Sequence, residues 1–244
     1  MQQKCLSAVT AAVVITAVTL TAARSADPKG LESLAKLKAG NAQFVADPEK
    51  AAVVTAERRT ALAQGQTPFA TILSCADSRV PPEVIFHAGL GELFVVRAAG
   101  NITDRAILAS VEYATEHLNV PLIVVMGHES CGAVKAAVET PAGKSLGPNL
   151  DYLLKAIRPS VAETATTPSA QRLRAAILAN VEETLNVLID ESAILKKAGA
   201  EGSVNFVGAY YELASGKVHF SEPIDLTNHP TAAGAKGHAK GGSH

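Results

Sequence analysis

The sequence predicts an α/β protein with a mostly parallel central sheet flanked by helices. Apolar runs rich in β-branched residues alternate along the 244-residue chain with segments whose apolar residues recur every three or four positions. The first three runs are continuously apolar, which is typical of parallel strands covered on both faces. Strands that alternate with helices favour an α/β fold. We expect about four parallel strands in the order 2-1-3-4, numbered along the chain, and a C-terminal antiparallel strand at one edge.

The individual elements follow from these two patterns. Apolar stripes at helical spacing predict helices at residues 31–45, 56–64, 103–118 and 172–197. Continuous apolar runs predict strands at residues 68–74, 92–97, 121–127 and 203–212. A last strand at 217–220 follows a turn at Ser215 and Gly216, so we expect it to form a hairpin with the strand before it.

The N-terminus has the layout of a secretory signal peptide. Lys4 precedes the uncharged stretch 5–23, and small residues follow at a cleavable position. An uncleaved membrane anchor is the alternative, but the stretch is weakly apolar for a span of about 20 residues. We therefore expect a cleaved signal peptide over residues 1–25, a periplasmic or secreted protein, and no stable membrane span after cleavage. One domain is expected over residues 28–226, with a flexible tail over 227–244.

The composition suits one globular domain and excludes nucleic acid as a partner. The chain is 48% hydrophobic and 18% charged, and its formal net charge is −1. A nucleic-acid-binding domain normally carries a basic face, and no such stripe is visible.

Two thiols and one imidazole follow predicted strands. Cys75 directly follows the first strand, and His128 and Cys131 directly follow the third. In open α/β sheets, functional side chains gather beyond the carboxyl ends of neighbouring strands. Two cysteines and one histidine form a known ligand set for catalytic zinc, with a fourth position left open. On spacing alone, a disulfide or two free thiols remain as plausible as zinc.

A carboxylate and a guanidinium lie beside the first cysteine. Asp77 and Arg79 follow Cys75 in the segment C-A-D-S-R. A disulfide gains nothing from such a pair, whereas a hydrolytic metal site can use a carboxylate near an activated water. Arg79 would hold the carboxylate in a bidentate grip. The alternative is a simple turn, because aspartate and serine are common turn residues.

Three segments together resemble the signature segments of β-class carbonic anhydrases. They are S-C-A-D-S-R-V-P-P-E, E-L-F-V-V-R-A-A-G-N and G-H-E-S-C-G-A-V, and the resemblance extends over about residues 31–220. It implies that Cys75, His128 and Cys131 bind Zn²⁺. It also implies reversible hydration of carbon dioxide to bicarbonate and a proton by zinc-bound hydroxide.

The same resemblance implies roles for residues around the metal. Asp77 and Arg79 match the catalytic pair, with Asp77 orienting the hydroxide. Gln66 and the backbone N–H of Gly132 match substrate contacts. Family members can also adopt a closed state in which this aspartate becomes the fourth zinc ligand, and we expect Asp77 to do so at low pH. They are typically dimers or assemblies of dimers, so Gln66 is expected to reach the zinc of a neighbouring subunit.

The sequence departs from the family at three positions, and two alternatives stay open. Ala98 stands where many members have asparagine. Ile72 replaces a tryptophan found in members with a regulatory bicarbonate pocket, which argues against that regulation. His87 stands where relatives often have aspartate and is a weak candidate for a proton shuttle. The alternative functions are a carbon disulfide or carbonyl sulfide hydrolase using the same site, and a non-catalytic zinc or thiol module.

Overall fold

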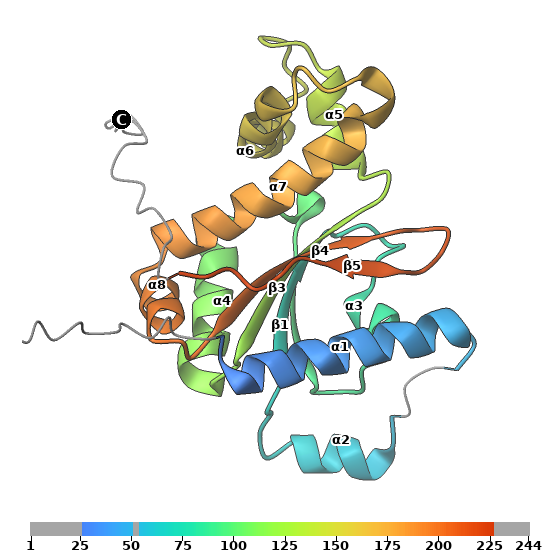
Figure 1. Cartoon of the computed structure of the whole chain (residues 1–244), viewed down its shortest axis with the longest axis vertical. Coiled ribbons are helices and arrows are strands. Elements are labelled where there is room, and N and C mark those ends of the chain that lie inside the picture. The colour runs from blue at the N-terminus through green and yellow to red at the C-terminus, as the bar shows by residue number, and fades with distance from the viewer. Residues whose placement is uncertain (1–25, 51–53, 227–244) are drawn as a thin grey trace, which may run out of the picture.

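The computed structural model describes residues 26–50 and 54–226. The expected signal peptide, 1–25, and the expected tail, 227–244, lie outside these residues. The described chain forms one five-stranded sheet in the order β2-β1-β3-β4-β5 (Figure 1). The first four strands are parallel and β5 is antiparallel to β4, which confirms the predicted fold class. The strands are β1 (Ala70–Ser74), β2 (Leu93–Arg97), β3 (Leu122–His128), β4 (Asn205–Tyr211) and β5 (Val218–Phe220).

Helices cover both faces of the sheet. One face packs against α1 (Pro28–Ala46) and α3 (Pro82–Ile85), and the other packs against α4 (Arg105–Leu118), α7 (Ser169–Glu191) and α8 (Ala193–Ala200). Two further helices, α5 (Gly132–Glu139) and α6 (Pro148–Glu163), lie against α7 beyond the carboxyl ends of the strands. The short α2 (Ala56–Leu62) lies apart from the sheet in Figure 1.

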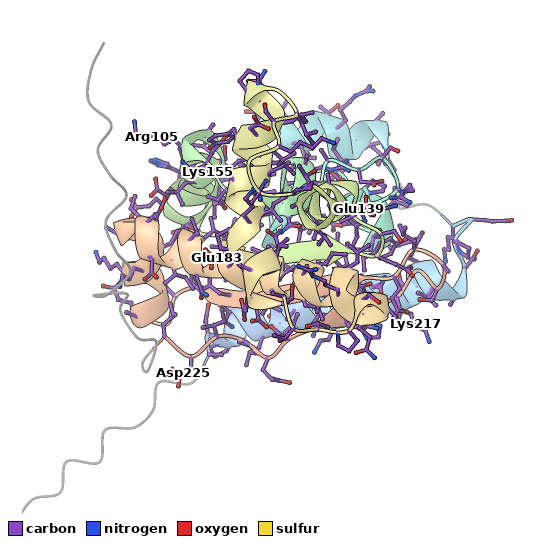
Figure 2. All side chains as sticks on the ribbon, turned by 90° about the horizontal axis from the view of Figure 1, so that it is seen from above. Arg105, Glu139, Lys155, Glu183, Lys217 and Asp225 are labelled. Atoms are coloured by element: carbon purple, nitrogen blue, oxygen red, sulfur yellow. The ribbon has the colours of Figure 1, made fainter. Side chains whose placement is uncertain are left out.

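The central strands form the core because both of their faces are covered. Every residue of β1, β3 and β4 is buried. Charged side chains lie outside this core, as Figure 2 shows for Arg105, Glu139 and Lys155 on three different helices. Among the described residues, no helix is both long enough and apolar enough to span a bilayer.

Gly127 lets α7 lie close to β3. A Cβ at this position would come within 2.8 Å of a methyl carbon of Val181 and 2.9 Å of one of Ile177, both on α7. Real side chains almost never approach that closely, so a larger residue would push the helix away from the sheet. The close contact fixes α7 beside the strand that ends at His128.

The prediction of one helix over residues 172–197 is wrong at one point. The chain leaves the helical conformation at Ser192, where α7 ends and α8 begins. The Ser192 hydroxyl accepts a hydrogen bond from the amide of Leu195 and donates one to Glu112 of α4. A serine side chain that binds nearby backbone competes with helix continuation and caps the next helix instead. The helix α6 was not predicted at all.

Candidate metal centre

The structure brings the three predicted ligands together. Cys75 follows β1, His128 is the last residue of β3, and Cys131 precedes the first turn of α5. Because β1 and β3 are directly paired, both loops emerge side by side at the carboxyl edge of the sheet. One potential ligand atom from each residue lies within 4.8 Å of the others, and all three residues are buried.

The hydrogen bonds of His128 leave one ring nitrogen available to a metal. Its Nδ1 lies 2.9 Å from the carbonyl oxygen of Glu129. Because a carbonyl only accepts hydrogen bonds, Nδ1 carries the proton and Nε2 keeps its lone pair. Nε2 is buried and has no hydrogen-bond partner among the described residues. A buried polar atom left without a partner is costly, and a metal ion held by the neighbouring thiols would satisfy it.

The two cysteines are free thiols whose pKa values move in opposite directions. A hydrogen bond from Cys131, together with hydrogen bonds from backbone amides including that of Gly100, lowers the pKa of Cys75. The same interaction with Cys75, together with burial, raises the pKa of Cys131. Two buried thiols this close do not both ionise readily on their own, and a divalent cation between them would stabilise both thiolates. This donor set fits zinc.

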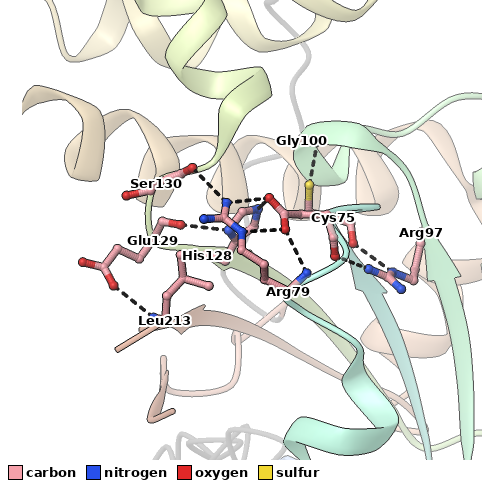
Figure 3. Close-up of polar contacts among 9 residues, drawn as sticks. Cys75, Arg79, Arg97, Gly100, His128, Glu129, Ser130 and Leu213 are labelled. Atoms are coloured by element: carbon pink, nitrogen blue, oxygen red, sulfur yellow. Dashed lines mark hydrogen bonds and ion pairs between the residues drawn. The ribbon is translucent and has the colours of Figure 1, made fainter. Parts of the chain in front are cut away.

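Asp77 and Arg79 form a bidentate ion pair beside the cluster, and Figure 3 shows Arg79 near His128. The Arg79 Nε and Nη2 donate to the two carboxylate oxygens at 2.9 and 2.6 Å. These hydrogen bonds hold the pKa of Asp77 well below its usual range. The Asp77 Oδ2 lies 3.9 Å from the unpartnered Nε2 of His128. Asp77 also accepts from the backbone amide of Arg79, so the predicted turn and the predicted ion pair coexist.

Arg97 fixes the backbone of the loop that carries Cys75 and Asp77. Its Nε donates to the Cys75 carbonyl oxygen at 2.9 Å, and its Nη2 donates to that of Asp77 at 2.5 Å (Figure 3). Arg97 has no role among the predictions from the sequence, although the residue lies within the second signature segment. Its position at the end of β2 becomes informative only once β2 is known to pair with β1.

Gly132 lies beside the cluster, whereas Gln66 does not. Gly132 begins α5 directly after Cys131 and is exposed. Gln66 is exposed on the loop before β1, at the opposite end of that strand from Cys75. Within one chain, Gln66 is therefore separated from the cluster by the length of the strand. His87 is half-buried just beyond the end of α3, and its proposed shuttle role stays a prediction.

Comparison with known proteins identifies the family. The family model described as carbonic anhydrase matches residues 70–218. The chain is 42% identical over 189 residues to carbonic anhydrase 2 of Mycobacterium tuberculosis, which covers 77% of this chain and 91% of that protein. It is 40% identical over 188 residues to the carbonic anhydrase of Mycolicibacterium smegmatis, covering 75% and 88%.

Solved structures agree with these sequence relatives. The Coccomyxa β-carbonic anhydrase in complex with acetazolamide aligns with a TM-score of 0.63 at 28% identity, over 68% of this chain and 78% of that one. A tetrameric β-carbonic anhydrase from Sordaria macrospora aligns with a TM-score of 0.61 at 28% identity, over 79% and 96%.

The fold and the cluster define an α/β protein with a candidate metal centre of two cysteines and one histidine. The chain belongs to the β-class carbonic anhydrase family. It is accordingly an enzyme of the lyase class.

Proposed function

We propose that the protein catalyses the reversible hydration of carbon dioxide with zinc held by Cys75, His128 and Cys131. The observation that carries this proposal is the buried Nε2 of His128, which has no hydrogen-bond partner among the described residues and lies beside two free thiols. Zinc bound there supplies a Lewis acid, which in such sites lowers the pKa of water to about 7.

In this proposal, Asp77 orients the attacking nucleophile. An ionised carboxylate can only accept hydrogen bonds, so it selects an O–H that points toward it and leaves the oxygen lone pair facing the substrate carbon. The low pKa of Asp77 keeps the carboxylate ionised during catalysis. Arg79 fixes its direction through the bidentate contact, and the Gly132 amide at the start of α5 is available to a substrate oxygen.

Carbon dioxide and bicarbonate are the proposed substrates because the family relatives are carbonic anhydrases. The test is a direct comparison of carbon dioxide hydration with carbon disulfide and carbonyl sulfide hydrolysis, measured alongside zinc content and thiol titration under denaturation. Fast hydration by a protein that holds zinc supports the proposal. A protein with faster turnover of the sulfur substrates, or with neither zinc nor titratable thiols, contradicts it.

We propose that the chain works as a homodimer or as an assembly of dimers. The helix α2 buries none of its residues against the described chain, and a seven-residue helix is unstable without packing. A second subunit that covers α2 would also bring Gln66, which follows this helix, toward another metal centre. Light scattering coupled to size-exclusion chromatography tests the assembly, and a monomer that remains fully active contradicts it.

We also propose export, which rests on residues 1–25 alone. N-terminal sequencing of the protein recovered from cell fractions tests it. Export predicts a chain that begins near residue 26 outside the cytoplasm, and an intact N-terminus in the cytoplasm contradicts it.

A further inference from the structure

The turn η1 (Ala99–Asn101) contacts the candidate metal centre through its backbone. The Gly100 amide donates a hydrogen bond to the Sγ of Cys75 at 3.3 Å (Figure 3). Both groups are buried, so water does not compete for this bond. The direction of one backbone N–H therefore affects the charge on a proposed metal ligand.

This turn has an unfavourable backbone conformation. Gly100 and Asn101 have φ values of 66° and 46°, so two successive residues lie in the left-handed region. Glycine adopts this conformation readily, but asparagine does so at some cost. A Cβ on Gly100 would also come within 2.8 Å of Ile157 on α6 and 3.1 Å of Ala133 on α5. Such a conformation persists only when surrounding groups hold it.

Two polar side chains of α7 contact the turn. The Asn180 Nδ2 donates to the Gly100 carbonyl oxygen at 2.7 Å. The Thr184 hydroxyl lies 3.2 Å from the Asn101 carbonyl oxygen and 2.8 Å from that of Asn180, so its one proton is shared between them. Asn180 is 2% exposed and Thr184 is 5% exposed. Buried polar side chains are costly unless they are hydrogen-bonded, and here these bonds are made to the turn.

We propose that Asn180, with Thr184, is a positioning residue of the metal centre, because it holds the Gly100 turn so that the Gly100 amide points at the Cys75 sulfur. The two side chains lie one helical turn apart on α7 and bind consecutive carbonyls of η1. Since α7 is fixed against β3 at Gly127, it provides a rigid support. This inference rests on the proposed function, in which Cys75 binds zinc.

The proposed metal site therefore depends on α7, although α7 carries none of the three metal ligands. Without the hydrogen bond from the Gly100 amide, the Cys75 sulfur would be more electron-rich, because it loses one donor. Replacement of such outer partners typically weakens metal binding about 10-fold to 100-fold. A more electron-rich sulfur also moves the thiolate-to-cobalt charge-transfer band of a Co²⁺-substituted site to lower energy.

The test uses Asn180→Leu, which removes the donor and keeps the number and branching of the side-chain heavy atoms. Zinc affinity is measured by competition with a chromophoric chelator, and the charge-transfer band is measured after Co²⁺ substitution. The matched control is Asn186→Leu, which changes an exposed asparagine of the same helix. We expect about 10-fold weaker zinc binding and a red-shifted band for Asn180→Leu, and wild-type values for the control.

A second pair of variants separates the hydrogen bond from packing. Thr184→Val keeps the shape and removes the hydroxyl, whereas Thr184→Ser keeps the hydroxyl. We expect Thr184→Val to shift the charge-transfer band to lower energy and Thr184→Ser to leave it unchanged. If Asn180→Leu does not fold, these two variants test the inference on their own. A lower unfolding midpoint with wild-type zinc affinity and band position in these variants overturns the inference. If the wild-type protein itself does not bind zinc through Cys75, the proposed function fails and this inference fails with it.

Discussion

Asp77 has two neighbours that define its chemistry, the guanidinium of Arg79 and the free Nε2 of His128. The Arg79 guanidinium keeps the carboxylate ionised and oriented. The His128 Nε2, a proposed metal ligand, lies 3.9 Å from the carboxylate. A charged acceptor next to a nucleophile contributes through orientation, so its removal should slow the reaction without emptying the metal site.

Asp77→Asn should lower kcat/KM for carbon dioxide hydration by at least about 100-fold, the usual scale for a positioned carboxylate. The amide keeps the shape but no longer selects one orientation of the nucleophile. Stopped-flow hydration with a pH indicator measures the rate, and metal analysis should give wild-type zinc. Near-wild-type activity in a zinc-loaded variant would disprove the role of Asp77.

Arg79→Gln should reduce activity by about the same factor at every pH between 6 and 9. The Arg79 hydrogen bonds lower the pKa of Asp77, so their loss lets that pKa rise toward the ordinary aspartate value of about 3.9. Asp77 then stays ionised above pH 6, and the defect comes from lost orientation. A pH–rate profile checks this. Activity that recovers as pH rises would show instead that Arg79 controls the protonation of Asp77.

Four of the site residues that the sequence predicted lie at the end of a strand or within three residues after it. Cys75, Asp77, His128 and Cys131 could be found because their order and spacing are local. Arg97 and Asn180 could not, since they act through backbone carbonyls that lie 20 to 80 residues away in sequence. No spacing rule in one sequence reveals such a contact.

At the scale of elements, the break between α7 and α8 changes the direction of the chain before it enters β4. Ser192 both caps α8 and donates to Glu112 of α4, so one side chain ties three helices together. The three central strands β1, β3 and β4 were predictable because each is a buried apolar run. The helix α6 was not, because Pro159 interrupts its pattern and few of its residues are buried.

Ser192→Ala should destabilise the protein by about 1–2 kcal/mol, the usual cost of losing a helix N-cap. Its matched control is Ser110→Ala in α4, where the hydroxyl bonds only back to the Ala106 carbonyl among the described contacts. The control should change stability by less than about 0.5 kcal/mol. Urea denaturation measures both, and equal effects would contradict the capping role.

At the scale of the whole molecule, two features of the single chain point to a second subunit: the exposed helix α2 and the position of Gln66. No residue of α2 is fully buried, and Gln66 lies at the opposite end of β1 from the metal cluster of its own chain. Both features are explained if a second subunit packs on α2. The sequence indicated this mainly through the family resemblance, and otherwise only because the helices before the first strand need a surface to pack on.

Mixing two inactive variants tests whether Gln66 acts across subunits. In a heterodimer of Gln66→Ala and Asp77→Ala chains, one metal centre has its own Asp77 and receives Gln66 from the partner, so it should be intact. Co-refolded chains should therefore recover a substantial part of wild-type activity, whereas either variant alone stays low. No recovery in a proven heterodimer would mean that Gln66 acts within its own chain, and a fully active Gln66→Ala variant would mean that Gln66 has no role.

The central claim is that zinc bound by Cys75, His128 and Cys131 carries out carbon dioxide hydration. The most direct measurement is stopped-flow hydration by the purified protein before chelation, after chelation, and after stepwise return of Zn²⁺. The account predicts that activity disappears with the metal and returns in proportion to zinc, reaching its maximum at about one ion per chain. Full activity in the zinc-free protein, or a zinc-saturated protein that does not hydrate carbon dioxide, would contradict it.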